Sequence, residues 1–185
     1  NGRICSSGTQ KNWKDVLMPQ KSNDILPRKP KVALIGSGYW GKNLVRNMNR
    51  LGELAMVCDR DVSLLADFRK QMPGVETCLA LSDVLARDDI DAVVISTPAE
   101  THYTVAREAL LAGKHVFVEK PMALSGADAA ALIDLSENRS RILMVGHLLQ
   151  YHPGFEKLKQ LVSEGELGRI NYIYSHRLNL GKIRR

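Results

Sequence analysis

The residue of this chain that is best suited to chemistry is Lys120, in the triplet Glu119-Lys120-Pro121 directly after the strand-like run 115–118. Oxidation of a secondary alcohol needs a group that stabilises the reacting oxygen and a base that accepts the hydroxyl proton. An ammonium group suits the first task, because it is a compact charge whose pKa can fall when it is buried, and Pro121 restricts the backbone beside it. The alternative interpretation is a surface ion pair between Glu119 and Lys120.

A second chemical feature is the stretch Gly36-Ser37-Gly38-Tyr39-Trp40-Gly41, in which the glycines have the spacing G-x-G-x-x-G. It follows the apolar run Val32–Ile35 and precedes a helical pattern that stops at Gly52. The first glycine permits a tight turn, the second lets the backbone approach a pyrophosphate, and the third lets the helix pack closely on the strand. The free amides at the start of the helix would face the phosphates, so the stretch predicts a dinucleotide site.

An acidic residue completes this pattern. Asp59 follows the second predicted strand, eighteen residues after Gly41, where a carboxylate can accept both hydroxyls of an adenosine ribose. A carboxylate there favours NAD, whereas the neighbouring Arg60 could accommodate the 2′-phosphate of NADP. The structural alternative for Asp59 is to cap a helix that starts near Asp61. S-adenosylmethionine-dependent methyl transfer also uses a glycine loop and such an acid, but it explains neither the third glycine nor Lys120.

The segment after the fourth predicted strand carries further candidates. Thr97, Pro98 and Glu100 have the spacing of an N-cap, a first helical position and a third helical position, which predicts a capping box. This helix start lies at the carboxyl end of a strand, where doubly wound sheets bind ligands. Thr97 and His102 are therefore candidate cofactor contacts, with capping alone and a solvent-facing histidine as the respective alternatives.

These residues need a scaffold, and the hydrophobic pattern supplies one from Lys31 onward. Apolar strand patterns alternate with helical patterns, which predicts a doubly wound parallel sheet of the Rossmann type covered on both faces. The predicted strands are 32–35, 54–58, 75–78, 92–96, 115–118 and 142–145, and the helices lie between them, one of them short and capped by Ser82 or Asp83 and another capped by Ser125.

The sequence patterns at the two ends of the chain differ from the strand and helix alternation of the predicted cofactor domain. Residues 1–30 are polar and proline-containing, so we expect a flexible or loosely docked extension, with a partner-binding arm as the alternative. The cofactor domain is expected over 31–150. After it, Pro153–Val162 has the pattern of a helix with Phe155, Leu158 and Leu161 on its buried face, and 169–178, including His176, that of a strand. Residues 151–185 thus predict only the beginning of a second α/β domain for substrate binding and oligomerisation.

Composition narrows the class of protein. The 185 residues are 44% hydrophobic with a net charge of +6, and no run is long enough to predict a membrane span. Residues 1–31 carry seven Lys or Arg and two Asp, whereas residues 32–185 carry nineteen basic and eighteen acidic side chains. The predicted domain is nearly neutral, which argues against nucleic acid. Cys5, Cys58 and Cys78 have neither metal-ligand nor disulfide-framework spacing, so we expect no metal and a reducing cytoplasm.

In these features the sequence resembles the glucose-fructose oxidoreductase, inositol dehydrogenase and rhizopine catabolism (Gfo/Idh/MocA) family of sugar dehydrogenases. The resemblance runs from about Lys31 to the end and rests on four stretches: the glycine loop 36–41, Ser96-Thr97-Pro98 with His102, Glu119-Lys120-Pro121, and Gly146-His147 with Tyr151-His152-Pro153. It implies that Lys120 is the catalytic lysine, that its bond to Pro121 is often cis, and that the glycine loop, Asp59, Thr97, Pro98 and Glu119 line the NAD(P) site.

The segments 38–44, 146–153 and 177–185 are most similar to the branch that oxidises the C3 hydroxyl of UDP-N-acetylglucosamine or its glucuronate form. This likeness implies a UDP-sugar substrate, with His147, Tyr151, His152 and Arg177 as candidate substrate contacts, and structural hydrogen bonding as the alternative for the two histidines. A dehydrogenase of a free sugar or inositol is a further alternative.

The sequence departs from the family pattern in one respect. Family members carry a second domain with an Asp-x-x-x-His motif, whose histidine is usually the second catalytic group, and no such motif follows Arg169. The chain is therefore expected to be a fragment of an oligomeric enzyme, and an NAD-binding module without catalysis is the competing hypothesis.

Overall fold

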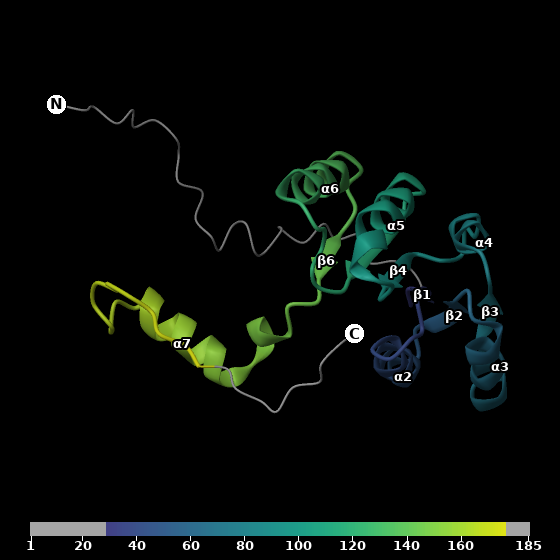
Figure 1. Cartoon of the computed structure of the whole chain (residues 1–185), viewed down its shortest axis with the longest axis horizontal. Helices are drawn as coiled ribbons and strands as arrows, with labels where there is room; N and C mark the ends of the chain where they lie inside the picture. Colours follow the sequence, from purple (N-terminus) through teal and green to yellow (C-terminus); the bar gives the residue numbers. More distant parts are fainter. Residues whose placement is uncertain (1–28, 177–185) are drawn as a thin grey trace.

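The computed structural model describes residues 29–176 of the chain. Its centre is a parallel sheet with the strand order β3-β2-β1-β4-β5-β6 (Figure 1). The strands are β1 Val32–Ile35, β2 Leu54–Cys58, β3 Glu76–Cys78, β4 Ala92–Ile95, β5 His115–Val118 and β6 Leu143–Val145. All six predicted strands are confirmed, with ends that differ by at most one residue. The order reverses between β1 and β4, and doubly wound sheets bind ligands at such a switch point.

Helices cover both faces of this sheet because successive side chains of a strand point to opposite sides. The helices are α2 Gly41–Leu51, α3 Val62–Gln71, α4 Leu81–Leu85, α5 Ala99–Leu111 and α6 Gly126–Asn138. On one face, Leu34 of β1 packs with Val45 of α2 and Phe68 of α3. On the other, Ile35 packs with buried residues of α4, α5 and α6. The two groups of helices lie on opposite sides in Figure 1.

Most helix ends follow the sequence signals, but two do not. Gly52 ends α2 in the left-handed conformation, and the Ser125 hydroxyl caps α6 by accepting a hydrogen bond from the Asp128 N–H. The predicted cap of α4 is wrong, because the N-cap residue is Ala80, which has no capping side chain. The predicted capping box is also wrong: Pro98 is the N-cap of α5. Thr97 does not cap the helix because its hydroxyl is bonded to the Thr101 hydroxyl and its carbonyl to the His102 ring.

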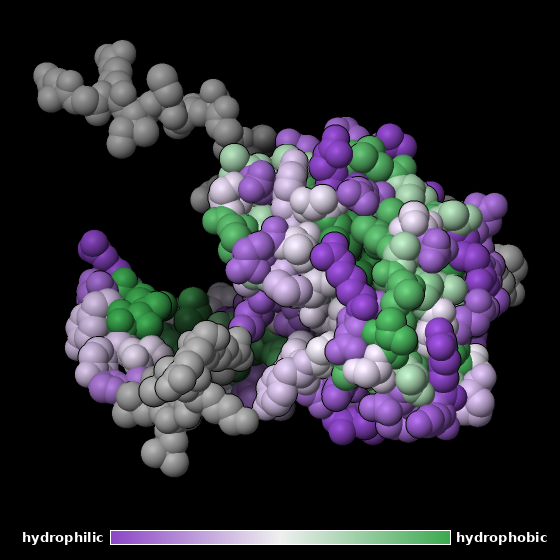
Figure 2. All heavy atoms as spheres, turned by 45° about the vertical axis from the view of Figure 1, so that its right-hand side comes forward, coloured by the Kyte–Doolittle hydropathy of each residue, from purple (hydrophilic) through white to green (hydrophobic). Residues whose placement is uncertain are grey.

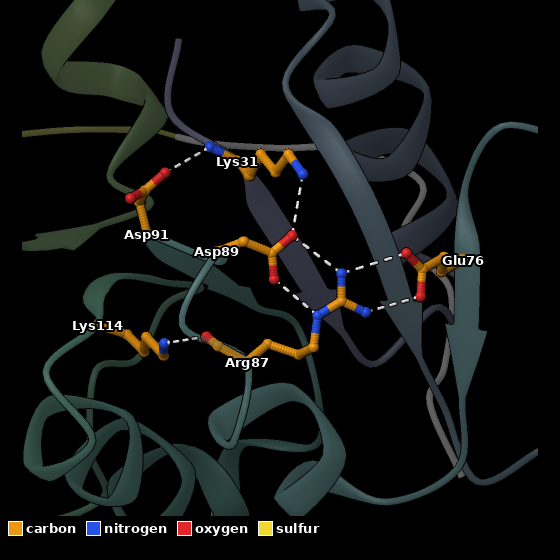
Figure 3. Close-up of polar contacts among 6 residues, drawn as sticks. All are labelled: Lys31, Glu76, Arg87, Asp89, Asp91 and Lys114. Atoms are coloured by element: carbon orange, nitrogen blue, oxygen red, sulfur yellow. Dashed lines mark hydrogen bonds and ion pairs between the residues drawn. The ribbon is translucent and has the colours of Figure 1, made fainter. Parts of the chain in front are cut away.

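An ion-pair network joins the amino ends of the strands, at the sheet edge opposite the switch-point loops (Figure 3). The Arg87 guanidinium donates to both carboxylate oxygens of Asp89 and of Glu76, and the Lys31 ammonium lies 2.9 Å from Asp89. The buried Lys114 ammonium donates to the Arg87 carbonyl. Hydrogen bonds from Arg87 hold the pKa values of Asp89 and Glu76 below their usual range. This edge is therefore structural.

The C-terminal arm consists of η1 Leu148–Tyr151 and α7 Pro153–Ser163. The α7 helix is confirmed, with the His152 side chain as its N-cap, but it has no buried residue, so the predicted buried face is wrong. Phe155 and Leu161 are partly exposed and Leu158 is exposed. The arm extends away from the sheet in Figure 1, and hydrophobic surface is visible on it in Figure 2.

The expected strand over 169–178 is wrong for the part that the structure describes. Residues 169–176 form no strand, and Tyr172, Ile173 and Tyr174 are exposed. A strand needs a neighbouring strand for its hydrogen bonds, and no described segment pairs with this one. His176 instead makes an edge-to-face contact with Tyr174, with ring centres 4.5 Å apart. Within residues 29–176, no helix has the length and hydropathy needed to cross a membrane.

Candidate functional site

The glycine bend after β1 is shaped by contacts with the loop after β4. Gly36 has φ +87°, and a Cβ atom there would lie 2.7 Å from the Thr97 nitrogen. A Cβ atom on Gly41 would lie 2.2 Å from the Gly36 carbonyl oxygen, which also accepts a hydrogen bond from the Ser96 hydroxyl. A Cβ atom on Gly38 would meet no protein atom within 4 Å. Two of the glycines are therefore required by the protein itself, and Gly38 is not.

The acid after β2 is bound to the glycine bend. The Asp59 carboxylate accepts hydrogen bonds from the backbone N–H (2.6 Å) and hydroxyl (2.8 Å) of the buried Ser37, and from the Asp61 N–H (3.0 Å). Burial alone would raise the pKa of Asp59, but the hydrogen bonds from Asp61 and Ser37 outweigh burial and lower it. The group is therefore an anion at neutral pH. Asp61 separately caps α3, which was the structural alternative for Asp59.

These bonds limit what Asp59 can offer to a ligand. A carboxylate has about four lone-pair positions, and the protein already uses three of them. Accepting both hydroxyls of a ribose would thus require one position to be shared. The neighbouring Arg60 is exposed.

The loop after β4 is held by side chains of the helix that follows it. The Thr101 hydroxyl makes 2.7 Å hydrogen bonds with the Thr97 hydroxyl and the Pro98 carbonyl. His102 is buried, with Nδ1 2.6 Å from the Pro121 carbonyl oxygen and Nε2 2.9 Å from the Thr97 carbonyl oxygen. The solvent-facing alternative for His102 is therefore wrong. A cofactor contact through a ring nitrogen would break one of these bonds.

Glu119 connects the glycine bend to the segment after β5. Its buried carboxylate accepts a hydrogen bond from the Trp40 indole N–H at 2.7 Å and from the Lys120 backbone N–H at 3.3 Å. Gly146 leaves room for this group, since a Cβ atom there would lie 3.1 Å from the carboxylate. The Lys120–Pro121 peptide bond is cis, as the resemblance implied.

Lys120 itself is exposed, and among the described residues its ammonium group makes neither an ion pair nor a hydrogen bond. The alternative of an ion pair between Glu119 and Lys120 is therefore wrong for this structure, because the Glu119 carboxylate is bound to Trp40 instead. The lysine lies at the carboxyl end of β5, the second strand out from the switch point.

The remaining predicted residues lie on the surface near these loops or outside the described part. Tyr39 and Pro98 are exposed. His147, Tyr151 and His152 lie on the exposed arm after β6, and the contacts of the His152 ring are with its own helix end. Arg177 lies outside the described residues, as do residues 1–28 of the predicted extension over 1–30.

Sequence reasoning missed the structural roles of three residues: Ser96 as the donor to the Gly36 carbonyl, Trp40 as the donor to Glu119, and Gly146 as the space for its carboxylate. The position of Ser96 directly after a buried strand was a usable signal. The other two contacts join segments 79 residues apart in one case and 27 in the other, and no local pattern encodes them.

The strand order, with a glycine bend after β1 at the switch point and an acid after the neighbouring β2, defines a dinucleotide-binding Rossmann domain. A family comparison agrees with this class: the model described as "Oxidoreductase family, NAD-binding Rossmann fold" matches residues 30–147. The chain belongs to this family, Gfo/Idh/MocA, and its cofactor is NAD.

Individual relatives carry varied names. A UDP-N-acetylglucosamine 3-dehydrogenase from Acidithiobacillus ferrooxidans is 31% identical over 153 residues, which are 80% of this chain and 45% of that protein. A 4-carboxy-2-hydroxymuconate-6-semialdehyde dehydrogenase from Sphingobium is 32% identical over 139 residues, with 74% and 44% covered.

Among solved structures, the WlbA dehydrogenase from Chromobacterium violaceum, in complex with NADH and UDP-GlcNAcA, matches with a TM-score of 0.72 and 30% identity. The match covers 78% of this chain and 43% of that one. The chain thus spans less than half the length of each of these three relatives.

Proposed function

We propose that this chain provides the NAD-binding domain and the catalytic lysine of a dehydrogenase that oxidises a secondary hydroxyl of a nucleotide-linked amino sugar. The substrate is UDP-N-acetylglucosamine or its glucuronate, and the hydroxyl is that at C3. In this proposal residues 31–150 form the cofactor domain, and residues 151–185 begin a second domain.

The observation that carries the proposal is the state of Lys120. Its ammonium has no partner among residues 29–176, while the acid beside it in the sequence is buried and bound to Trp40. A cation on a flexible stem at the carboxyl end of a strand is free to contact a reacting oxygen. Bound NAD supplies the hydride acceptor. The Lys120 ammonium stabilises the oxygen of the reacting alcohol, and the hydroxyl proton passes to a base, for which the histidine of the second-domain motif remains the expectation.

Two further observations support cofactor placement. The amides at the start of α2 and the bend at Gly38, where no protein atom crowds the backbone, suit a pyrophosphate. Asp59, an anion fixed by Ser37, suits the adenosine ribose. Candidate cofactor contacts are the loop 36–41, Asp59, Arg60, Thr97, Pro98 and Glu119, and His147, Tyr151, His152 and Arg177 remain candidate substrate contacts.

The substrate class rests on the named relatives. A UDP-N-acetylglucosamine 3-dehydrogenase and a structure holding NADH with UDP-GlcNAcA both match about four fifths of this chain. The semialdehyde dehydrogenase at similar identity makes an aldehyde substrate the main competitor, so substrate assays need both classes.

The test compares Lys120→Ala with the unaltered protein in the longest chain that the reading frame encodes. NADH formation is followed at 340 nm with each UDP-sugar, and NAD binding is followed by calorimetry. We expect the affinity for NAD to change less than about threefold and turnover to fall at least about 100-fold, because the oxyanion-stabilising group is lost. Lys120→Arg is the charge-matched control, which we expect to recover turnover only partly. Unchanged turnover in Lys120→Ala would remove Lys120 from the mechanism.

A second candidate is an NAD-binding module without catalysis, since the family model that matches residues 30–147 describes an NAD-binding fold. It predicts binding of NAD without NADH formation from any UDP-sugar or aldehyde. The same calorimetric and absorbance measurements on the 185-residue chain separate the two candidates.

A further inference from the structure

His102 differs from the other residues around the site because its ring is buried and bonded to main-chain carbonyl groups on both sides. The side chain is 2% exposed. Nδ1 lies 2.6 Å from the Pro121 carbonyl oxygen, and Nε2 lies 2.9 Å from the Thr97 carbonyl oxygen. A carbonyl oxygen can only accept a hydrogen bond. Both contacts are therefore hydrogen bonds only if both ring nitrogens carry a proton.

We propose that His102 is held as an imidazolium cation and is the positioning residue for Lys120, because it clamps the carbonyl that follows Lys120 to the loop after β4. This inference deepens the proposed function. Its turnover test rests on that function, because the position of Lys120 affects the rate only if Lys120 is the catalytic lysine.

The backbone around Lys120 is bound by side chains on both sides. Its own N–H donates to the Glu119 carboxylate at 3.3 Å, and the carbonyl of the next residue, Pro121, accepts from His102. The other ring nitrogen of His102 binds Thr97, whose nitrogen and methyl group pack against Gly36. One ring thus connects the segment that carries the amine to the loop that packs on the glycine bend.

The charge state follows from the partners of the ring. A neutral imidazole would keep one of the two hydrogen bonds and turn a lone pair toward the other carbonyl oxygen, which is repulsive. A protonated ring makes two charge-assisted hydrogen bonds, which are roughly twice as strong as neutral ones. The acidic and basic residues closest in sequence to the ring and its two partners are Glu100, Glu119 and Lys120.

The first test measures the protonation of the ring in the unaltered 185-residue chain. Histidine is labelled with ¹⁵N, and the ring nitrogens of His102 are assigned through backbone-to-ring correlations. We expect both nitrogens to be protonated at pH 7. A ring with a single protonated nitrogen would overturn the proposal. This test needs no variant, so it holds even if substitution of His102 prevents folding.

The second test measures the position of the amine. Lysines are reductively methylated with ¹³C, and the Lys120 signal is assigned with Lys120→Arg. We expect His102→Gln to shift this signal, because the amide group of glutamine cannot span both carbonyls. The matched control is His115→Gln, at the opposite end of β5, where the ring accepts a single hydrogen bond from the Ile142 N–H. A Lys120 signal that stays in place in His102→Gln contradicts the clamp, and His102→Asn serves if the glutamine variant does not fold.

The third test uses turnover in the form of the protein that oxidises the sugar. Misplacing a reacting group by about 1 Å can cost roughly 100-fold in rate, so we expect His102→Gln to lower kcat about 10- to 100-fold and to leave the KM for NAD within about threefold. His115→Gln should leave both unchanged. Unaltered kcat in His102→Gln contradicts the proposal. If the unaltered protein forms no NADH, the proposed function fails, while the two spectroscopic tests still decide the clamp.

Discussion

The contrast between Gly41 and Gly38 separates what the glycine bend does for the fold from what it does for a ligand. A methyl group on Gly41 would lie 2.2 Å from the Gly36 carbonyl oxygen and 2.9 Å from the Ser96 hydroxyl. The first of these is a backbone atom that cannot turn away. Overpacking of this kind costs about 1–3 kcal/mol, so we expect Gly41→Ala to lower the melting temperature by roughly 3–10 °C.

Gly38→Ala should behave in the opposite way. Its methyl group would meet no protein atom within 4 Å, and its φ lies outside the left-handed region. We therefore expect stability to stay the same or to rise by about 0.4–1 kcal/mol, because alanine restricts the unfolded chain. If a pyrophosphate binds against this backbone, the methyl group displaces it. The loss of one or two hydrogen bonds to a charged group, about 3 kcal/mol, would weaken NAD binding roughly 100-fold.

The assay is a urea titration and an NAD calorimetric titration of both variants beside the unaltered chain. The expected pattern is a loss of stability in Gly41→Ala and a loss of binding in Gly38→Ala. If Gly38→Ala bound NAD with unchanged affinity, the pyrophosphate would not lie on this bend. If Gly41→Ala were as stable as the unaltered chain, the close contact with Gly36 would be wrong.

Three further changes test other parts of the site and the fold. Asp59→Asn removes the charge that repels a 2′-phosphate, so the ratio of NADP to NAD affinity should rise at least about tenfold; an unchanged ratio in competitive titrations would argue against an adenosine ribose at this position. Trp40→Phe removes a donor from the buried Glu119 carboxylate, and we expect a loss of about 1–3 kcal/mol in urea unfolding that largely disappears in a Glu119→Met background, where no acceptor remains for the indole N–H; additive losses would contradict the contact. Arg87 lowers the pKa values of two carboxylates, whose contribution to stability is present above their unfolded pKa of about 4 and is lost as the pH falls below it. Arg87→Met should therefore flatten the acid limb of a stability curve between pH 7 and pH 3, whereas Arg107→Met, on the surface of α5, should leave it unchanged.

The sequence predicted the sheet well because its strands are buried on both faces. Runs such as Val32–Ile35 and Ala92–Ile95 must be continuously apolar in a doubly wound sheet, so the pattern and the fold coincide. The glycine bend and Asp59 were also predictable, since their spacing is set by one strand, one helix and one turn. The NAD cofactor followed from the same spacing, and the family comparison confirms it.

Predictions from local sequence patterns were wrong where tertiary structure decides the outcome, as at the predicted helix cap Thr97 and the predicted strand 169–178. The Thr97 hydroxyl pairs with Thr101 and the Thr97 carbonyl is bound by His102, so the residue belongs to the loop and does not cap the helix. The alternation at Ile170, Tyr172 and Tyr174 is typical of a strand, but a strand requires a partner that residues 29–176 do not supply. The roles proposed for the site residues remain predictions, because neither fold nor family tests them one by one.

The two edges of the sheet use their carboxylates in different ways, and this difference bears on function. At the amino edge, Asp89 is paired with the cations of Arg87 and Lys31. At the carboxyl edge, Asp59 and Glu119 are bound by N–H and O–H groups that carry no charge, from Ser37, Asp61, Trp40 and the Lys120 backbone. An ion pair with either acid would neutralise a cation that a phosphate or a reacting oxygen needs. Because uncharged donors satisfy the acids, the Lys120 ammonium stays available at the edge where the proposed substrate and cofactor meet.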